Sequence, residues 1–133
     1  MLVFLDVLKN NEGVFLVPYV KGSHGASVAR GKLQRFSDES FRLIGGAAVV
    51  KIVNDFYEIP WEETEPSELY NSMTSRARNA FLKKSLMLII VGQKGTGQIQ
   101  LATEANDRSE PVSLEEPDQI AAELLKWFEL HFD

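Results

Sequence analysis

The sequence predicts a single α+β domain in which a mixed or antiparallel sheet is packed by about three helices. Residues 86–91 are all apolar and three of them are β-branched, which favours a buried central strand. The glycine-containing turn at 92–97 and the alternating residues 98–101 indicate a partner strand with one wet face. Helical periodicity occurs elsewhere in blocks that do not alternate strictly with strands, as is typical of α+β proteins. We expect strand 86–91 to be covered on both faces.

Length and composition limit what the chain can be. At 133 residues it is long enough for one domain, residues 1–133, and its 8 Phe and 2 Trp can fill a core. The absence of cysteine excludes disulfides and Cys-ligated zinc, and fits a reducing cytosol. No apolar run reaches the roughly 20 residues that cross a bilayer, and the first residues lack the basic region of a signal peptide. We therefore expect a cytoplasmic protein without membrane contact.

Two apolar stretches open the chain, at 2–8 and 14–20. The Asn- and Gly-containing link between them predicts a hairpin. Pro18 cannot donate a ladder hydrogen bond, so we expect the second strand at a sheet edge or at a bulge. Residues 27–36 are expected to form a further strand.

A helix is expected to begin after Ser37, which is followed by two acids and has the features of an N-cap. Gly45 and Gly46 lie inside this helix, and the pair implies close backbone packing or a break. The helix should end before Pro60. Its apolar stripe consists of Phe41, Ile44, Ala48, Ile52 and Phe56.

Two further helices are expected. One runs from Pro66 to about Lys84, and the other follows a predicted loop at 104–112. The last helix has two candidate starts, a capping box at 113–116 and Pro117 at the first helical position. The apolar face of the earlier helix consists of Leu69, Met73, Ala77, Ala80 and Phe81.

Charge is distributed unevenly along the chain. The net charge of −5 argues against a general nucleic-acid binder, because such proteins neutralise phosphates with Lys and Arg. Residues 52–70 hold six acids and no base, whereas residues 71–103 hold five bases and no acid. The basic block is better explained as a solvated face than as a phosphate-binding surface, since Arg76 and Arg78 point apart on a helix.

Few residues suggest catalysis. The glycines at 92–97 do not fit a P-loop, because Gln98 and Ile99 stand where Lys and Ser/Thr are required. His24 lies beside Ser23 in a glycine-flanked loop, where it could act as the general base of a small hydrolase or transferase. An exposed loop histidine is the more common finding.

The remaining titratable groups have ordinary explanations. His131 lies on the apolar stripe of the last helix, where a cation suits the C-terminal end. Neighbouring glutamates such as 62–63 and 115–116 leave open the two-acid pattern of a glycosidase, but solvated acidic runs are usually just surface. We expect no catalytic residue, no cofactor and no metal ion.

The first acidic block also contains aromatic residues, which suggests a partner-binding surface. Aromatic side chains supply buried contact area, and carboxylates around them steer a basic partner. The acidic segment 104–118 could join this surface in space. The alternative is that the carboxylates serve solubility alone. The candidate partner-binding residues are Asp55, Tyr57, Glu58, Trp61, Glu62, Glu63, Glu65, Glu68 and Tyr70.

A cysteine-free α+β domain with acids around aromatics at 55–70 and no catalytic motif resembles the small acidic immunity proteins of bacterial toxin systems, including contact-dependent growth inhibition. The resemblance is one of overall character. It implies a tight, electrostatically steered complex with a basic toxin domain, often a nuclease, whose active site or substrate groove is blocked. Trp61 and its neighbours would be the anchors. A further alternative is a subunit of a larger assembly that docks through the helix end at 128–132.

Overall fold

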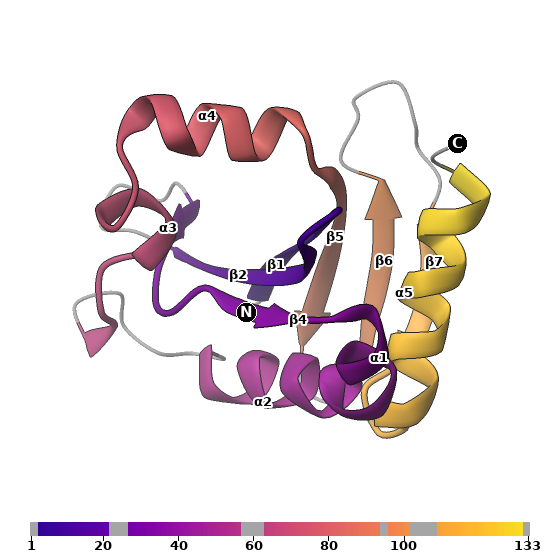
Figure 1. Cartoon of the computed structure of the whole chain (residues 1–133). Helices are drawn as coiled ribbons and strands as arrows, with labels where there is room; N and C mark the ends of the chain where they lie inside the picture. The colour runs from indigo at the N-terminus through magenta and orange to yellow at the C-terminus, as the bar shows by residue number, and fades with distance from the viewer. Residues whose placement is uncertain (1–2, 22–26, 57–62, 94–95, 102–108, 132–133) are drawn as a thin grey trace.

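The computed structural model describes residues 3–21, 27–56, 63–93, 96–101 and 109–131. One antiparallel sheet forms the centre, with strand order β3-β2-β1-β5-β6-β7 and with β4 paired to β2 (Figure 1). The α+β prediction is therefore confirmed. The strands are β1 (Val3–Asn10), β2 (Gly13–Lys21), β3 (Ser27–Ala29), β4 (Gln34–Phe36), β5 (Leu86–Gln93), β6 (Thr96–Leu101) and β7 (Ser109–Ser113). The helices are α1 (Asp38–Ser40), the π-helix η1 (Phe41–Gly45), α2 (Gly46–Phe56), α3 (Glu68–Asn71), α4 (Ser75–Lys83) and α5 (Pro117–His131).

The two predicted hairpins are present. β1 and β2 are joined by the two residues 11–12, and Gly13 adopts φ 132, a conformation that a residue with a Cβ rarely takes. β5 lies between β1 and β6, which confirms it as a central strand.

The two faces of the sheet are covered by different helices. Leu5, Leu88 and Ile90 point to the face beneath α2 and α5 and are fully buried. The opposite face packs against α3 and α4, where the rings of Phe15 and Phe81 meet edge to face with centroids 4.9 Å apart. Figure 1 shows α4 and α2 on opposite sides of the sheet.

Helices lie over both faces of β5, as expected, but they cover the two faces unequally. On the α4 side, Met87, Ile89 and Val91 are only half-buried. The apolar cluster beneath α3 and α4 is built mainly on residues of β1 and β2, and Met87 is the member of β5 that joins it. A nine-residue α4 is too short to reach across all of the central strands.

β2 lies inside the sheet, so the first of the two positions predicted from Pro18, a sheet edge, is wrong, and Pro18 lies instead where the neighbouring strand is interrupted between β3 and β4. The Pro18 carbonyl oxygen accepts a hydrogen bond from Arg30 N–H at 3.0 Å. Because the N and C=O of one residue point the same way from an antiparallel strand, the missing N–H of Pro18 faces the interruption between β3 and β4. No ladder hydrogen bond to β1 is lost there. Residues 27–36 were expected to form one strand, but they form two short ones, β3 and β4.

The helix after Ser37 begins as predicted, and the Ser37 hydroxyl accepts a hydrogen bond from Ser40 N–H at 3.0 Å. The predicted stripe fails at Ile44, which is exposed. The π turn of η1 adds a residue to the helical repeat and moves Gly45 into the buried position instead. A Cβ on Gly45 would overlap the ring of Phe41, and a Cβ on Gly46 would overlap the carbonyl of Pro117 in α5. Both consequences predicted for the glycine pair, close packing and a break in the regular helix, are therefore present.

The single helix expected from Pro66 to about Lys84 is wrong. The chain forms α3, leaves the helical conformation, and restarts at α4, where the Thr74 hydroxyl accepts a hydrogen bond from Ala77 N–H at 3.1 Å. The cap reorients the second helix, so Ala77 and Ala80 are exposed rather than packed.

Two further differences concern the C-terminal part. Residues 109–113 form strand β7 where a loop was expected, and Pro111 is tolerated because β7 is an edge strand. α5 begins at Pro117, which confirms the second of its two candidate starts. In the helix end 128–132, the alternative docking surface, Phe128 is only 2% exposed whereas Leu130 is 62% exposed.

Replacing Gly46 with alanine should destabilise the protein. The added methyl would overlap a backbone carbonyl, so α5 must move away from the core. We expect the free energy of unfolding in urea to fall by about 2–3 kcal/mol, although alanine is normally the better helix residue. Ala47→Gly, at the exposed neighbouring position, is the control and should lose only about 1 kcal/mol. An unchanged or higher stability of Gly46→Ala would contradict the close approach of α5.

Candidate functional site: a pinned acidic edge

The structure describes part of the predicted partner-binding surface. Glu63, Glu65 and Glu68 are exposed, beside and within the first turn of α3. Asp55 is exposed at the end of α2 and forms an ion pair with Lys51 at 2.7 Å. Tyr57, Glu58, Trp61 and Glu62 lie outside the described residues, as do Ser23 and His24. Tyr70 belongs to α3, but its side chain is not among those described.

The segment that carries these carboxylates is tied to the sheet by its backbone. Gly31 N–H donates to the carbonyl oxygen of Glu65 at 2.9 Å, and Glu68 N–H donates to the carbonyl oxygen of Gly31 at 3.0 Å. Gly31 has φ 82, and the ring of Phe56 lies 3.1 Å from where a Cβ would stand. Glycine is therefore required at the point where the segment meets the sheet.

Arg30 makes the second set of contacts to the same segment. Its Nε donates to Thr64 Oγ1 at 2.7 Å, and a terminal guanidinium nitrogen donates to the Thr64 carbonyl oxygen. Its backbone also forms an isolated bridge with Pro66. A side chain with several donors in a fixed plane suits this two-point contact. The backbone of 64–68 is consequently held at the sheet margin.

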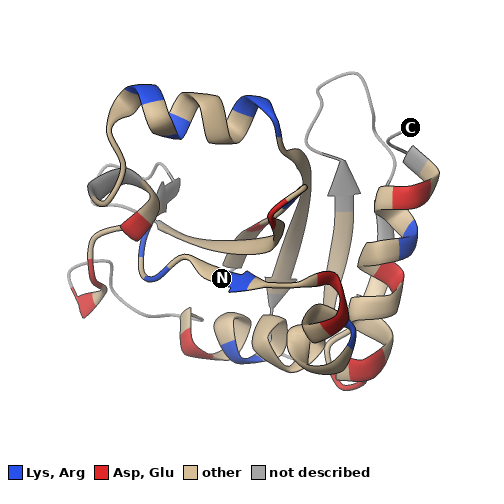
Figure 2. Cartoon of the chain, viewed as in Figure 1, with Lys and Arg blue, Asp and Glu red and all other residues tan. Residues whose placement is uncertain are grey.

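The three carboxylates on this segment have no counter-ion among the described residues. The ion pairs there are Lys9–Asp38, Lys51–Asp55 and Lys84–Glu12, and none involves Glu63, Glu65 or Glu68. We call these three residues the acidic edge. Figure 2 shows the red of this segment beside α3.

The second acidic segment does not extend the acidic edge. Its described charged residues Glu115, Glu116 and Asp118 lie around the start of α5, which Figures 1 and 2 place at the opposite end of the molecule from α3. The expectation that the two acidic segments meet is therefore wrong for these residues.

The basic block forms a separate surface along α4 (Figure 2). Arg76 is exposed and Arg78 is half-buried. Lys84, at the end of this helix, pairs with Glu12 in the first hairpin turn, and this contact lowers the pKa of Glu12. One of the bases is thus used to hold α4 against the sheet.

Asp6 was missed by sequence reasoning. It lies in β1 on the half-covered face, with Val17 and Ile89 as its register partners. Burial raises the pKa of its carboxyl from 3.8 to about 6, although a hydrogen bond from Tyr19 lowers it. The sequence did show an acid within the otherwise apolar run 2–8. Only the strand pairing, however, shows that this acid is half-buried.

Neither a group of metal ligands nor a membrane-spanning helix is found within the described ranges. No three His, Asp or Glu side chains there converge as metal ligands. None of the helices in that part of the chain is long and apolar enough to cross a membrane.

Comparison with known proteins identifies the fold only. No family model and no curated protein matches the chain. The structure is similar to that of a protein of unknown function from Neisseria meningitidis, with a TM-score of 0.62 and 14% sequence identity over 94% of this chain and 92% of that one. The likeness extends over nearly the whole of both chains and supports one common α+β architecture.

Removing the Arg30 side chain should loosen the acidic edge. We expect Arg30→Ala to speed hydrogen exchange of the Gly31 and Glu68 amides by about tenfold or more, because the two-point contact to Thr64 is lost. Amide exchange followed by NMR measures this. Arg76→Ala on α4 removes the same charge and should leave both amides unchanged. If the Gly31 and Glu68 amides exchange at the same rate in Arg30→Ala as in the natural chain, the guanidinium does not hold the segment.

Asp6→Asn should stabilise the protein at neutral pH. A carboxyl whose folded-state pKa is raised keeps its proton longer in the folded state, so stability falls as pH rises from about 4 to about 6 and then levels off. Each pKa unit is worth about 1.4 kcal/mol, and solvent around a half-buried group reduces the full value. We expect a gain of about 2 kcal/mol at pH 7.

The same gain should nearly vanish at pH 4, where Asp6 is protonated in the folded protein. Urea denaturation of both proteins across this range tests the expectation. A difference between Asp6→Asn and the natural chain that is the same at pH 4 and pH 7 would count against a buried, ionisable Asp6.

Proposed function

We propose that this chain is a non-catalytic binding protein that uses the acidic edge to bind a basic protein partner. The observation that carries the proposal is the combination of charge and fixed backbone. Glu63, Glu65 and Glu68 have no ion pair within the described residues, yet the backbone beneath them is held by Arg30 and Gly31.

This combination favours binding over solubility alone. Carboxylates that only keep a protein soluble need no fixed backbone. A surface that must match a partner binds more tightly if its backbone is already fixed, because less conformational entropy is lost when the complex forms. Unpaired charges of one sign also accelerate encounter with an oppositely charged partner, and salt at physiological strength screens this effect over about 8 Å.

We further propose that the partner is a toxin domain, so that the chain acts as an immunity protein. This step comes from the resemblance to immunity proteins together with the acidic edge. Seating carboxylates in the basic substrate groove of a toxin, often a nuclease, blocks that groove without chemistry. The chain then needs no cofactor and no direct contact with nucleic acid, and it acts in the cytoplasm.

The aromatic anchors of the proposed surface come from the sequence. Trp61 and Tyr57 lie between Asp55 and Glu63 in the chain, and Tyr70 follows Glu68. Aromatic residues at the centre of an interface contribute most of its affinity. Trp61 is therefore the proposed anchor, with Asp55, Glu58, Glu62 and the acidic edge as its charged surroundings.

Reversing charge on the acidic edge should slow binding to the partner. The immunity proposal requires a toxin gene beside the gene of this chain, and the basic domain of that toxin is the partner for this test. We expect Glu63→Lys/Glu65→Lys to lower the association rate constant by about tenfold or more at low salt, and to weaken its dependence on NaCl concentration. Stopped-flow kinetics over a range of NaCl concentrations measures both effects.

Glu115→Lys/Glu116→Lys is the matched control, because it changes net charge equally at the other end of the molecule. It should slow association far less. Equal slowing by the two double variants would contradict a local acidic binding surface. A neighbouring gene for a metabolic enzyme, with no toxin gene nearby, would contradict the immunity role while leaving the binding surface to be tested with other basic proteins.

A further inference from the structure

The outer surface where η1 packs against α5 contains a pocket of about 290 Å³. Leu125 is buried at its floor, and the side chains around it come from both elements. Figure 1 places α5, which supplies four of the five lining residues, at the end of the molecule away from α3. The pocket's lining residues are Arg42, Ala122, Leu125, Lys126 and Glu129.

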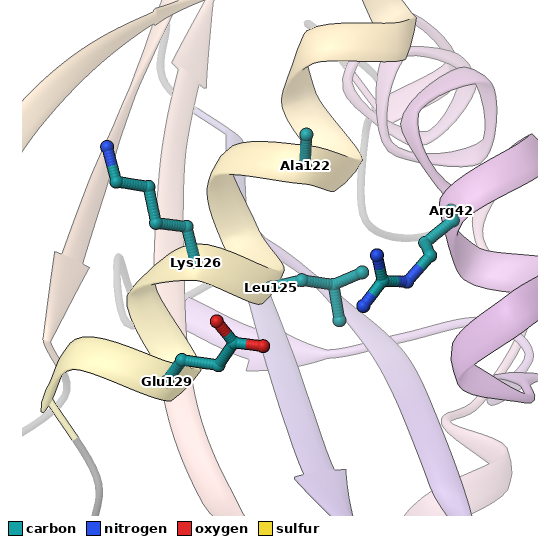
Figure 3. Close-up of a pocket in the computed structure, with 5 residues that line it drawn as sticks. All are labelled: Arg42, Ala122, Leu125, Lys126 and Glu129. Atoms are coloured by element: carbon teal, nitrogen blue, oxygen red, sulfur yellow. The ribbon is translucent and has the colours of Figure 1, made fainter.

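Opposite charges stand on the two walls of this pocket. Figure 3 shows Arg42 reaching from η1 towards Leu125, with the carboxylate of Glu129 turned to the same side of α5 and Lys126 extending away. Neither Arg42 nor Glu129 takes part in an ion pair in the described portion of the chain. The lining therefore carries two cations, Arg42 and Lys126, and one anion, Glu129, and Arg42 and Glu129 stand on opposite sides of the buried Leu125.

Exposed apolar side chains lie on the same two elements. Leu43 is 74% exposed and Ile44 is 56% exposed on η1, while Leu130 is 62% exposed on α5. The π turn is responsible for the exposure of Ile44, since it places Gly45 rather than Ile44 against the core. These three residues do not line the pocket, but they add exposed apolar area to the two elements that form it.

We propose that the η1–α5 surface binds a second copy of this chain about a two-fold axis. In such an interface a surface meets its own copy, so Arg42 faces Glu129 of the partner subunit, and Glu129 faces the partner's Arg42. The pocket has the pattern that this requires, a cation and an anion on opposite sides of an apolar centre. A partner of a single charge sign would leave either Arg42 or Glu129 unmatched.

The dimer is independent of the proposed immunity role. The acidic edge lies beside α3 and the η1–α5 surface lies at the other end, so the dimer leaves both acidic edges accessible (Figure 1). Self-association can therefore be measured on the full chain alone, without any toxin.

Charge reversal with mixing tests the two-fold pairing. We expect sedimentation equilibrium to show a dimer that dissociates on dilution. Arg42→Glu alone and Glu129→Arg alone should each weaken self-association by roughly 100-fold, because each creates two like-charge contacts per dimer. An equimolar mixture of the two variants should recover the dimer, since the carboxylate introduced in one variant would then face the guanidinium introduced in the other.

Arg76→Glu is the matched control, because it reverses an exposed charge on α4 and should leave the dimer intact. Circular dichroism establishes that each variant is folded. A natural chain that stays monomeric up to roughly 1 mM, single variants that associate as the natural chain does, or a mixture that stays monomeric would each overturn the proposal.

Discussion

Burial of strand β5 is the constraint on which the rest of the structure depends. Both faces of the strand are apolar, so the chain must provide a layer on each side. On one side α2 and α5 approach so closely that only glycine fits at Gly46. On the other side α4 covers only part of the strand, and Asp6 lies on the half-covered face with a pKa raised to about 6.

The same layering explains where the acidic edge lies. α2 covers one face and α3 with α4 the other, so the residues that lead into α3 must pass the margin of the sheet. There, Arg30 and Gly31 supply hydrogen bonds to the backbone of 64–68. The carboxylates are consequently fixed by the topology, whereas acids on a free loop would move independently of the sheet.

Local signals in the sequence were sufficient for the strongest elements. The Asn and Gly residues before Val14 mark the first hairpin, and the unbroken apolar run 86–91 marks the centre of the sheet. Long-range packing decided what was missed. The periodicity of the sequence does not predict that Gly45 faces the ring of Phe41, and therefore it does not predict that Ile44 is exposed. The acids at 63–68 were evident, but their fixed position depends on Gly31, which is distant in sequence.

The central claim is that this chain binds its partner through backbone-fixed carboxylates at one margin of the sheet. An NMR titration of the labelled chain with the basic toxin domain that the proposal requires tests this claim most directly. The account predicts that the largest amide shift changes cluster at 63–68 and in the neighbouring Arg30–Gly31 segment. Changes centred on Asp6 and Ile89, or on α4, with the 63–68 amides unaffected, would contradict it.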